Sequence, residues 1–386
     1  MPKIIFIILF FVLLLLSACS HKDQSLRLAK DFAVKYNPEQ SLDTFACRIK
    51  EYYQLPAIGI GTIDKNGNRT IAVTGKNKTA NGSPVNALSK FQIASCTKTF
   101  TALLVALMVS EGKITWETTL YEIFPEFEIH PLNQKINVLD LLTHTSGLAQ
   151  FWTDEEVFGI DSIIPGLSGP VEMQRNKFAS YNLKLPPPFK NGDYHYSNGG
   201  YVILAAMLEK ITGQSYENLV KEWIFKPLQL HTAEPGYSFL NDPHQPHRHF
   251  DRDNNGVGIP LQKSEKVPPE LFNPCGFISL SIEDFTKYTA HCIRLNTGQS
   301  FLLPKHISSK LFERHLSLPD GTGVGLGWQI IEVKGIKTYG HTGSDQTMRA
   351  ALAINPKKEK GVVFASNIGD LRSEQALVNV IHELVN

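Results

Sequence analysis

The sequence predicts an α+β fold in which an antiparallel sheet is flanked by helices and a mostly helical lobe is inserted within the chain. A helical pattern followed by a hairpin pattern opens the folded part, and strand patterns with a closing helix end it. Between them, the regular segments are helical. Since sheet faces and helix stripes bury one another in layers, we expect the two distant strand-bearing segments to complete one sheet.

The first sheet-forming segment is predicted to contain one helix and two strands. Apolar side chains recur on one helical face from Leu42 to Tyr52, and Ser41 stands before them as an N-cap. Residues 57–63 and 70–74 have the composition of strands. The residues 65–68 between them, Lys-Asn-Gly-Asn, favour a hairpin turn.

The central segment is predicted to be helical. An apolar run from Ala94 to Leu107 indicates a helix that ends near Gly112, and Asn137 could cap a short helix. Two further helical runs cover residues 201–211 and 216–225. The rest of the central segment is loop-rich.

The final segment is predicted to return to strands and to close with a helix, at residues 328–333, 337–339, 348–354, 361–366 and 375–384. The chain then divides into a signal segment, a tether and one folded unit that covers residues 41–386. In that unit, an α/β lobe brackets a helical lobe. The expected bounds of signal, tether, α/β lobe and helical lobe are 1–19, 20–40, about 41–94 with 270–386, and about 95–269.

The composition is that of an ordinary globular protein, with 42% hydrophobic and 19% charged residues among 386 and a formal net charge of +1. Because there is no basic excess, we expect no binding of nucleic acid. The length suffices for a large core.

The N-terminus has the features of an export signal. Lys3 provides a positive charge, and the apolar run from Ile4 to Leu16 is short for a membrane span. The sequence Leu16–Cys19 resembles the bacterial lipobox, in which Cys19 would be lipidated and become the mature N-terminus. We therefore expect a lipoprotein on the periplasmic side of a bacterial membrane. A plain signal peptide with cleavage nearby is the alternative.

Four further cysteines follow the signal: Cys47, Cys96, Cys275 and Cys292. An oxidising compartment permits disulfides between them, and the sequence leaves the three pairings open. No Cys-x-x-Cys pair occurs, so a structural zinc site is not expected.

Ser95 and Lys98 form a Ser-x-x-Lys pair at the start of the first long central helix. This spacing puts both side chains on one helical face, and the helix N-terminus favours an alkoxide on the serine. The apolar residues that follow would desolvate Lys98 and lower its pKa toward that of a usable base. A second pair, Ser110 and Lys113, lies where the helix ends, and we interpret it as a helix exit without chemistry.

Three motifs stand in order along the chain, together with a His-Thr-Ser-Gly-Leu segment at residues 144–148. They are Phe91–Phe100, Tyr194–Asn198 (Tyr-His-Tyr-Ser-Asn) and Gly340–Gly343 (Gly-His-Thr-Gly). In order and spacing they resemble the serine β-lactamase-related family, which includes class C β-lactamases, D-alanyl-D-alanine carboxypeptidases, D-aminopeptidases and carboxylesterases. The resemblance covers roughly residues 40–386 and implies a β-lactamase/transpeptidase-like fold.

The resemblance implies a role for each matching residue. Ser95 would attack a carbonyl to form an acyl-enzyme, and either Lys98 or Tyr196 would take its proton. The sequence does not decide between these two bases. Asn198 would orient Lys98 and the carbonyl side of the substrate, although it could instead be a turn residue before Gly199.

The third motif would form the other wall of the site. By resemblance, the backbone N–H groups of Ser95 and Ser344 form an oxyanion hole. Gly343 would let the substrate lie close to the strand, and Thr342 would add a hydroxyl contact. We expect no metal and no cofactor. The expected partner is a small-molecule or peptide substrate, and the chain is expected to be a monomer.

His341 occupies the position where the family has lysine or histidine. A lysine gives a permanent positive charge for a substrate carboxylate, whereas a histidine is mostly neutral at pH 7 unless its pKa is raised. Because histidine-bearing members include peptidases and esterases, His341 weakens the β-lactamase interpretation and keeps the hydrolase one.

Two other patterns resemble metal sites, and each lacks a ligand. Residues 247–251, His-Arg-His-Phe-Asp, imitate a zinc motif, but Arg252 follows where another histidine is wanted. Residues 251–256 resemble the start of a calcium loop, but its twelfth position is Gln262. No Gly-x-Ser-x-Gly elbow occurs, which excludes an α/β-hydrolase.

The sequence therefore predicts an exported, lipid-anchored serine hydrolase that cleaves an amide or ester through an acyl-enzyme on Ser95, as esterases and D-amino-acid peptidases do. One alternative is a true class C-like β-lactamase. Another is a non-catalytic penicillin-fold protein that binds a peptide or partner. Binding alone needs none of Ser95, Lys98 and Tyr196, so their joint presence argues for an enzyme.

If Cys19 is lipidated, Cys19→Ala is expected to leave an unlipidated precursor or a soluble product, because the acceptor thiol is gone. Metabolic labelling with a fatty acid and membrane fractionation measure this. Unchanged labelling and fractionation would contradict the lipobox interpretation.

Overall fold

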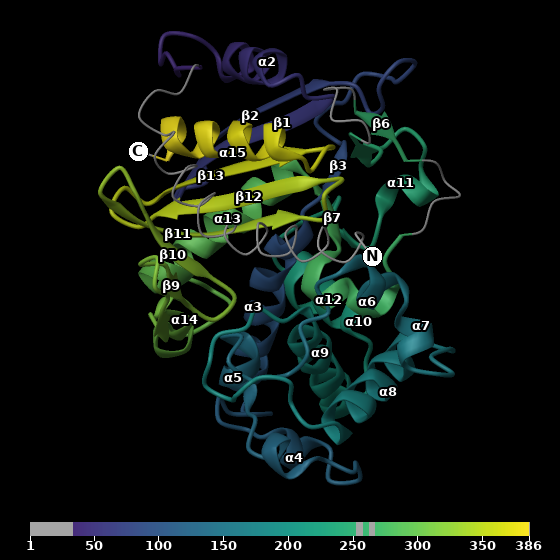
Figure 1. The fold of residues 1–386 in the computed structure, drawn as a ribbon. Coiled ribbons are helices and arrows are strands. Elements are labelled where there is room, and N and C mark those ends of the chain that lie inside the picture. The colour runs from purple at the N-terminus through teal and green to yellow at the C-terminus, as the bar shows by residue number, and fades with distance from the viewer. Residues whose placement is uncertain (1–33, 252–257, 262–266, 386) are drawn as a thin grey trace, which may run out of the picture.

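The computed structural model describes residues 34–251, 258–261 and 267–385. The predicted signal segment with Cys19, and the tether up to residue 33, lie outside the described residues. Within the described ranges, no helix combines the length and the apolar character that a membrane span requires. Figure 1 shows a sheet covered by helices, with further helices gathered beside it.

The first segment folds as predicted. α2 (Leu42–Tyr52) begins after Ser41, whose hydroxyl accepts a hydrogen bond of 3.2 Å from the Thr44 N–H. β1 (Ala57–Asp64) and β2 (Arg69–Gly75) pair as an antiparallel hairpin. The apolar stripe of α2 packs on this hairpin, which explains why the helix forms there.

The hairpin belongs to an eight-stranded antiparallel sheet with the order β2-β1-β13-β12-β11-β10-β9-β8. The other six strands come from the end of the chain: β8 (Leu316–Ser317), β9 (Gly323–Val324), β10 (Gln329–Val333), β11 (Ile336–Ser344), β12 (Arg349–Asn355) and β13 (Lys360–Ser366). β1 pairs with β13, with Ile58 opposite Ser366. Two segments far apart in the sequence therefore complete one sheet, as predicted (Figure 1).

Helices cover both faces of the sheet. α15 (Leu371–Leu384) lies with α2 over one face, where Ile60 and Phe364 are buried (Figure 1). α13 (Ile282–Thr297) packs on β1 and β13 from the other side. Burying one large apolar side chain contributes roughly 1.5–3 kcal/mol, so these layers fix the position of the sheet.

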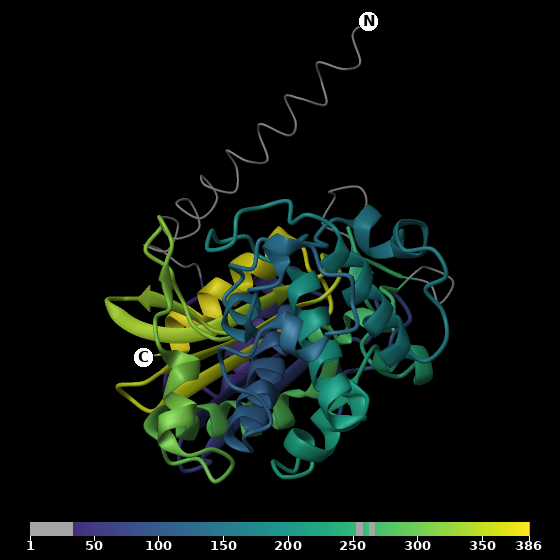
Figure 2. The same cartoon turned by 90° about the horizontal axis from the view of Figure 1, so that it is seen from below.

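The helices from the middle of the chain gather together beside the sheet (Figures 1 and 2). α3 (Thr97–Ser110) and α9 (Asn198–Thr212) are buried over most of their length. The other described helices of this part are η2 (Ala94–Cys96), α4 (Leu120–Ile123), η3 (Pro131–Asn133), α5 (Val138–Leu142), α6 (Asp154–Phe158), α7 (Ile160–Ile163), α8 (Val171–Lys184), α10 (Tyr216–Val220), η4 (Lys221–Phe225), α11 (Ser238–Asn241), η5 (Glu270–Phe272) and α12 (Asn273–Gly276). α14 (Lys305–Phe312) comes later in the chain, before β8. Short strands form two small sheets: β3 (Lys90–Gln92) with β7 (Ile278–Ser281) and β4 (Glu234–Pro235), and β5 (His249–Phe250) with β6 (Ile259–Pro260).

The sequence analysis missed two long helices. α8 lies in the part expected to be loop-rich, because its buried face includes Arg175 and Asn182 beside Phe178. Polar residues therefore interrupt the apolar stripe on which a helix prediction relies. α13 was missed as well, although Phe285, Tyr288 and Cys292 are buried along it at helical spacing.

Gly327 holds the sheet against the start of α3. Its φ is +74°, and a Cβ atom there would lie 2.6 Å from the Ala102 Cβ and 2.8 Å from the Lys98 carbonyl oxygen. Gly335 has a φ of +73° and no atom within 4 Å of the same position. The two glycines thus share the backbone conformation but not the close approach.

We expect Gly335→Ala to lower the free energy of unfolding by about 1 kcal/mol, because alanine disfavours positive φ. Gly327→Ala is expected to cost roughly 1–3 kcal/mol more, because the added methyl group overpacks the contact with α3. Urea denaturation measures both variants. Equal losses would show that the contact at Gly327 tolerates a methyl group.

Candidate active site

Ser95 lies in a tight turn at the start of α3. The turn is a short 3₁₀ segment, η2 (Ala94–Cys96), and Ala94 has a φ of +44°, a conformation that L-residues rarely adopt. Such strain persists only where the surrounding structure enforces it, and it occurs often at functional sites. The turn leaves Ser95 partly exposed, whereas Lys98 in the first turn of α3 is fully buried.

The ammonium group of Lys98 contacts three acceptors. Its Nζ lies 3.3 Å from the Ser95 Oγ, 2.8 Å from the Asn198 Oδ1 and 2.6 Å from the Cys275 carbonyl oxygen. Three acceptors match the three N–H donors of an ammonium group. Ser95 in η2 and Asn198 in α9 therefore meet at the Lys98 nitrogen, although Asn198 follows Lys98 by 100 residues.

Burial lowers the pKa of Lys98 to about 8 from its ordinary 10.5, because the low-dielectric interior disfavours the ammonium form. The Nζ also lies 4.8 Å from the ring centre of Tyr196 and 5.4 Å from that of Tyr201. Near pH 8, about half of the protein then has a neutral amine beside Ser95, and a neutral amine can accept a proton.

Tyr196 comes from the loop before α9. Its ring lies 4.2 Å from the ring of His144, and the edge of Trp152 approaches it at 5.3 Å. Burial raises the pKa of Tyr196 well above its usual 10, although a hydrogen bond with Ser95 acts in the opposite direction. Tyr196 is therefore a protonated phenol near neutral pH, within reach of Ser95.

Asn198 is the first residue of α9. Ser197 caps the helix, since its Oγ accepts a hydrogen bond from the Gly200 N–H. The Asn198 side chain donates to the Phe151 carbonyl at 2.9 Å and accepts from Lys98. Asn198 thus holds the lysine in place and is not a mere turn residue.

His144 is a neighbour of the site that sequence reasoning missed as a site residue. Its φ is +62°, and its Nδ1 accepts a hydrogen bond of 3.1 Å from the Ser197 N–H. Burial, followed by the positive charge of Lys98 and that of His341 when it is protonated, holds the pKa of His144 well below the usual value. A neutral His144 can therefore accept this bond and position the Tyr196 loop. Its only sequence signal was its place in the His-Thr-Ser-Gly-Leu segment.

The third motif lies on β11, on the sheet side of the site. A Cβ atom at Gly343 would lie 2.4 Å from the Ile93 carbonyl oxygen and 2.6 Å from the Ser95 nitrogen, so only glycine permits this approach. Thr342 and Ser344 are exposed on either side of it. β11 extends past the predicted residues 337–339 because glycines give its second half a weak strand signal.

His341 points inward and is only 5% exposed. Its Nδ1 lies 2.7 Å from the Thr342 carbonyl, where the nitrogen must carry the proton and donate. Burial, and then the charge of Lys98, lower its pKa to about 4. His341 would provide a charge near pH 7 only if its pKa were raised, and its pKa is lowered instead.

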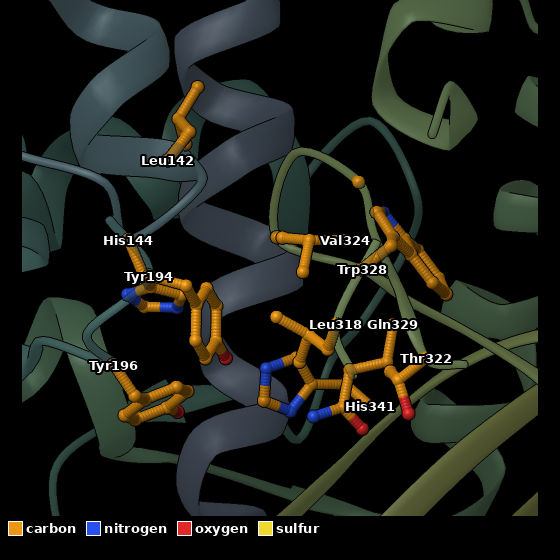
Figure 3. A pocket seen from close by; sticks show the side chains of 12 residues that line it. Leu142, His144, Tyr194, Tyr196, Leu318, Thr322, Val324, Trp328, Gln329 and His341 are labelled. Atoms are coloured by element: carbon orange, nitrogen blue, oxygen red, sulfur yellow. The ribbon is translucent and has the colours of Figure 1, made fainter. Parts of the chain in front are cut away.

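Figure 3 shows a small cavity where the two sides of the site meet. Tyr194 and Tyr196 approach it from the helical side, and His341 and Trp328 approach it from the strand side. Its volume, about 10 Å³ open to the centre of a water molecule, has room for about one water. The inner end of the site is therefore nearly closed, whereas Thr342 and Ser344 are exposed on its other side.

The competing patterns form no second site among the described residues. Ser110, of the second Ser-x-x-Lys pair, is exposed at the end of α3. His249 is buried, and its Nε2 accepts a hydrogen bond from the Thr79 N–H. No cluster of three metal ligands occurs in the described ranges, and residues 252–256 of the calcium-like pattern lie outside them. The four cysteines beyond residue 33 are free thiols.

The antiparallel sheet, the buried lysine behind a turn serine and the facing strand are the features expected of a penicillin-binding-protein/β-lactamase-like fold. A family model described as "Beta-lactamase" matches residues 42–385, so the chain belongs to the β-lactamase family. Similar curated proteins include "Protein flp" of Staphylococcus aureus strain MW2, with 23% identity over 90% of this chain and 67% of its own length. "Penicillin-binding protein 4" of Amycolatopsis lactamdurans is 24% identical over 74% of this chain and 73% of its own.

Solved structures resemble the fold. The octameric penicillin-binding protein homologue from Pyrococcus abyssi gives a TM-score of 0.72 at 24% identity, and covers 88% of this chain and 76% of its own. The penicillin-binding protein from Bacillus halodurans gives 0.71 at 21% identity, over 87% of this chain and 98% of its own. At such identities the likeness establishes the fold alone.

A fluorophosphonate probe is expected to label Ser95 because the Lys98 amine beside it can accept its proton. Ser95→Ala is expected to abolish labelling. Ser110→Ala is the matched control, since Ser110 has the same spacing to a lysine but no such surroundings, and it should label like the wild type. In-gel fluorescence measures all three proteins. Labelling of Ser95→Ala at the wild-type level would rule out Ser95 as the nucleophile.

Proposed function

We propose that the protein is a serine hydrolase that cleaves an ester or amide without a recognised carboxylate, through an acyl-enzyme on Ser95. The observation that carries this proposal is the buried Lys98 amine in contact with the Ser95 hydroxyl. Burial of a lysine costs free energy because it removes the ammonium group from water. A buried lysine next to a serine hydroxyl therefore fits the role of a base better than a purely structural role.

In the proposed reaction, the Ser95 Oγ attacks the substrate carbonyl carbon while its proton passes to the neutral Lys98 amine. The carbonyl oxygen becomes negative and is stabilised by the backbone N–H groups of Ser95 and Ser344. When the tetrahedral intermediate collapses, the bond to the leaving group breaks, and the alcohol or amine takes a proton. Water then repeats the sequence on the acyl-enzyme and releases the acid.

The proton transfers are divided between Lys98 and Tyr196. Since burial lowers the pKa of Lys98 to about 8 and raises that of Tyr196, Lys98 is the better base. In this proposal Tyr196 remains protonated and donates its proton to the leaving group, after which Lys98 returns a proton to it. Acylation is therefore expected to accelerate as the pH rises through about 8, where Lys98 becomes neutral.

The substrate preference follows from His341. In place of the permanent charge of a lysine, the site has a buried imidazole whose pKa is about 4 and whose Nδ1–H is already bound to Thr342. Such a group offers no charge to a carboxylate above about pH 5. An uncharged ester or a D-amino-acid amide therefore suits this wall better than the carboxylate of a penicillin.

A penicillin-recognising or D-alanyl peptide-cleaving activity is the second candidate. It is favoured by the names of related proteins, such as the penicillin-binding protein 4 of Amycolatopsis lactamdurans. The exposed Thr342 hydroxyl would then contact the carboxylate without help from a charge. For either activity, we propose that the protein acts outside the cytoplasm and is held at a membrane by lipid on Cys19.

A panel of a short p-nitrophenyl ester, a D-alanyl-D-alanine peptide and a chromogenic cephalosporin tests the substrate class. We expect the highest kcat/KM for the ester, and a KM for the two carboxylate substrates that stays flat from pH 6 to 9 because His341 is neutral throughout. His341→Lys is expected to improve kcat/KM for the cephalosporin relative to the ester about tenfold, through a charged hydrogen bond.

The ester rate in the same variant is the internal control, since the ratio cancels any loss of folded protein. His341→Gln, which adds no charge, should leave the ratio near that of the wild type. A wild-type KM that worsens for carboxylate substrates alone as the pH rises through about 6 would mean that His341 is charged, and it would overturn the proposed preference.

A further inference from the structure

We propose that Arg175, on α8, is a positioning residue that holds the turn 270–276 so that the Cys275 carbonyl stays on the Lys98 amine. The inference rests on the proposed role of Lys98 as the base. It assigns a function to a buried cation that touches neither Ser95 nor Lys98. Every carbonyl of the turn has a donor, Arg175 provides two of these donors, and Glu217 connects Arg175 to the turn a third time.

The turn 270–276 is held by donors at each of its carbonyl oxygens. Six of these donors are side-chain groups, from Arg175, Cys275, Thr101, Lys98 and Gln92, and two are the backbone N–H groups of Asn273 and Phe277. In order along the turn, the acceptors and donors are Glu270 with Arg175 and Asn273, Leu271 with Arg175, Phe272 with Cys275, Asn273 with Phe277, Pro274 with Thr101, Cys275 with Lys98, and Gly276 with Gln92. These two short helical turns, η5 and α12, thus have an acceptor–donor contact at every residue.

Among the described residues, Arg175 is the only side chain that binds two of these carbonyls. Its Nε donates to Leu271 at 3.1 Å, and a terminal nitrogen donates to Glu270 at 3.0 Å. Its remaining N–H groups bind the carboxylates of Glu209 and Glu217. The guanidinium is fully buried, and all five of its donors face an acceptor in a fixed fork.

The two carboxylates connect this cation to the rest of the helical lobe and back to the turn. Glu209 lies on α9 and also accepts the Tyr216 N–H at 2.9 Å. Glu217 lies on α10 and accepts a hydrogen bond of 2.9 Å from the Asn273 side chain, which belongs to the turn. Arg175 therefore binds the turn directly through two hydrogen bonds and indirectly through Glu217.

The position of the turn affects the protonation of Lys98 because the Cys275 carbonyl belongs to the turn. The Cys275 carbonyl is the shortest of the three contacts of Lys98, at 2.6 Å, and a carbonyl oxygen stabilises the ammonium form. If the turn moves, Lys98 loses this acceptor while α3 keeps it buried. The amine then gives up its proton more easily, and the pH at which it becomes a base falls.

The test follows the rate of Ser95 acylation by a neutral fluorophosphonate from pH 6 to 10, with the melting temperature of each protein recorded. Arg175→Lys keeps the positive charge against both glutamates but loses the fork that reaches two carbonyls. Asn273→Ala removes the hydrogen bond between the turn and Glu217, and it leaves Arg175 unchanged. Both are expected to move the midpoint of the pH–rate profile downward by roughly 0.3–1 pH unit, the equivalent of one hydrogen bond.

Asn133→Ala is the matched control. The Asn133 side chain is buried and donates to the Leu183 and Leu185 carbonyls at the far end of α8, away from the turn. It should lower the melting temperature without moving the midpoint. This separates a loss of stability in the same lobe from a change at Lys98.

A midpoint that stays in place, or moves upward, in the Arg175 and Asn273 variants overturns the proposal and makes the network purely structural. If Arg175→Lys does not fold, Asn273→Ala decides alone. A wild-type profile with no rise between pH 6 and 10 is a different failure, because it rejects Lys98 as the base and the proposed function with it.

Discussion

The site depends on one buried nitrogen. The Lys98 Nζ joins the turn that holds Ser95, the helix that begins with Asn198 and the turn that contains Cys275. A buried ammonium is costly unless every donor is satisfied, and removing one acceptor would leave that cost uncompensated. The surrounding helical lobe can therefore be understood as a support that keeps three acceptors around this group.

The sheet forms the opposite side of the site. Its third motif has a neutral His341 in place of the charged lysine that the family can have there. Gly343 brings β11 against the backbone of Ser95, while His341 turns inward and binds Thr342. The same interior that makes Lys98 a better base makes His341 a poorer cation, because burial disfavours the charged form of both groups. The proposed activation of the serine and the proposed preference for substrates without a carboxylate thus have one physical cause.

Much of this was predictable from the sequence where local patterns determine structure. Ser41 and Asn137 cap the helices they were expected to cap, and the terminal strands lie where their composition placed them. α8 was not predictable, because its inner face uses Arg175 for hydrogen bonds instead of apolar packing. The Cys275 carbonyl left no signal at all, since every residue has one and only the fold decides which is used.

The most direct measurement is the titration of the Lys98 amine itself. Lysine labelled with ¹³C at the ε-carbon reports its protonation by NMR, and the Lys98→Arg variant assigns the resonance. The account predicts a midpoint near pH 8, well below that of the exposed lysines. A midpoint near the ordinary 10.5 would contradict it, because Lys98 would then be almost wholly protonated at neutral pH and could not activate Ser95.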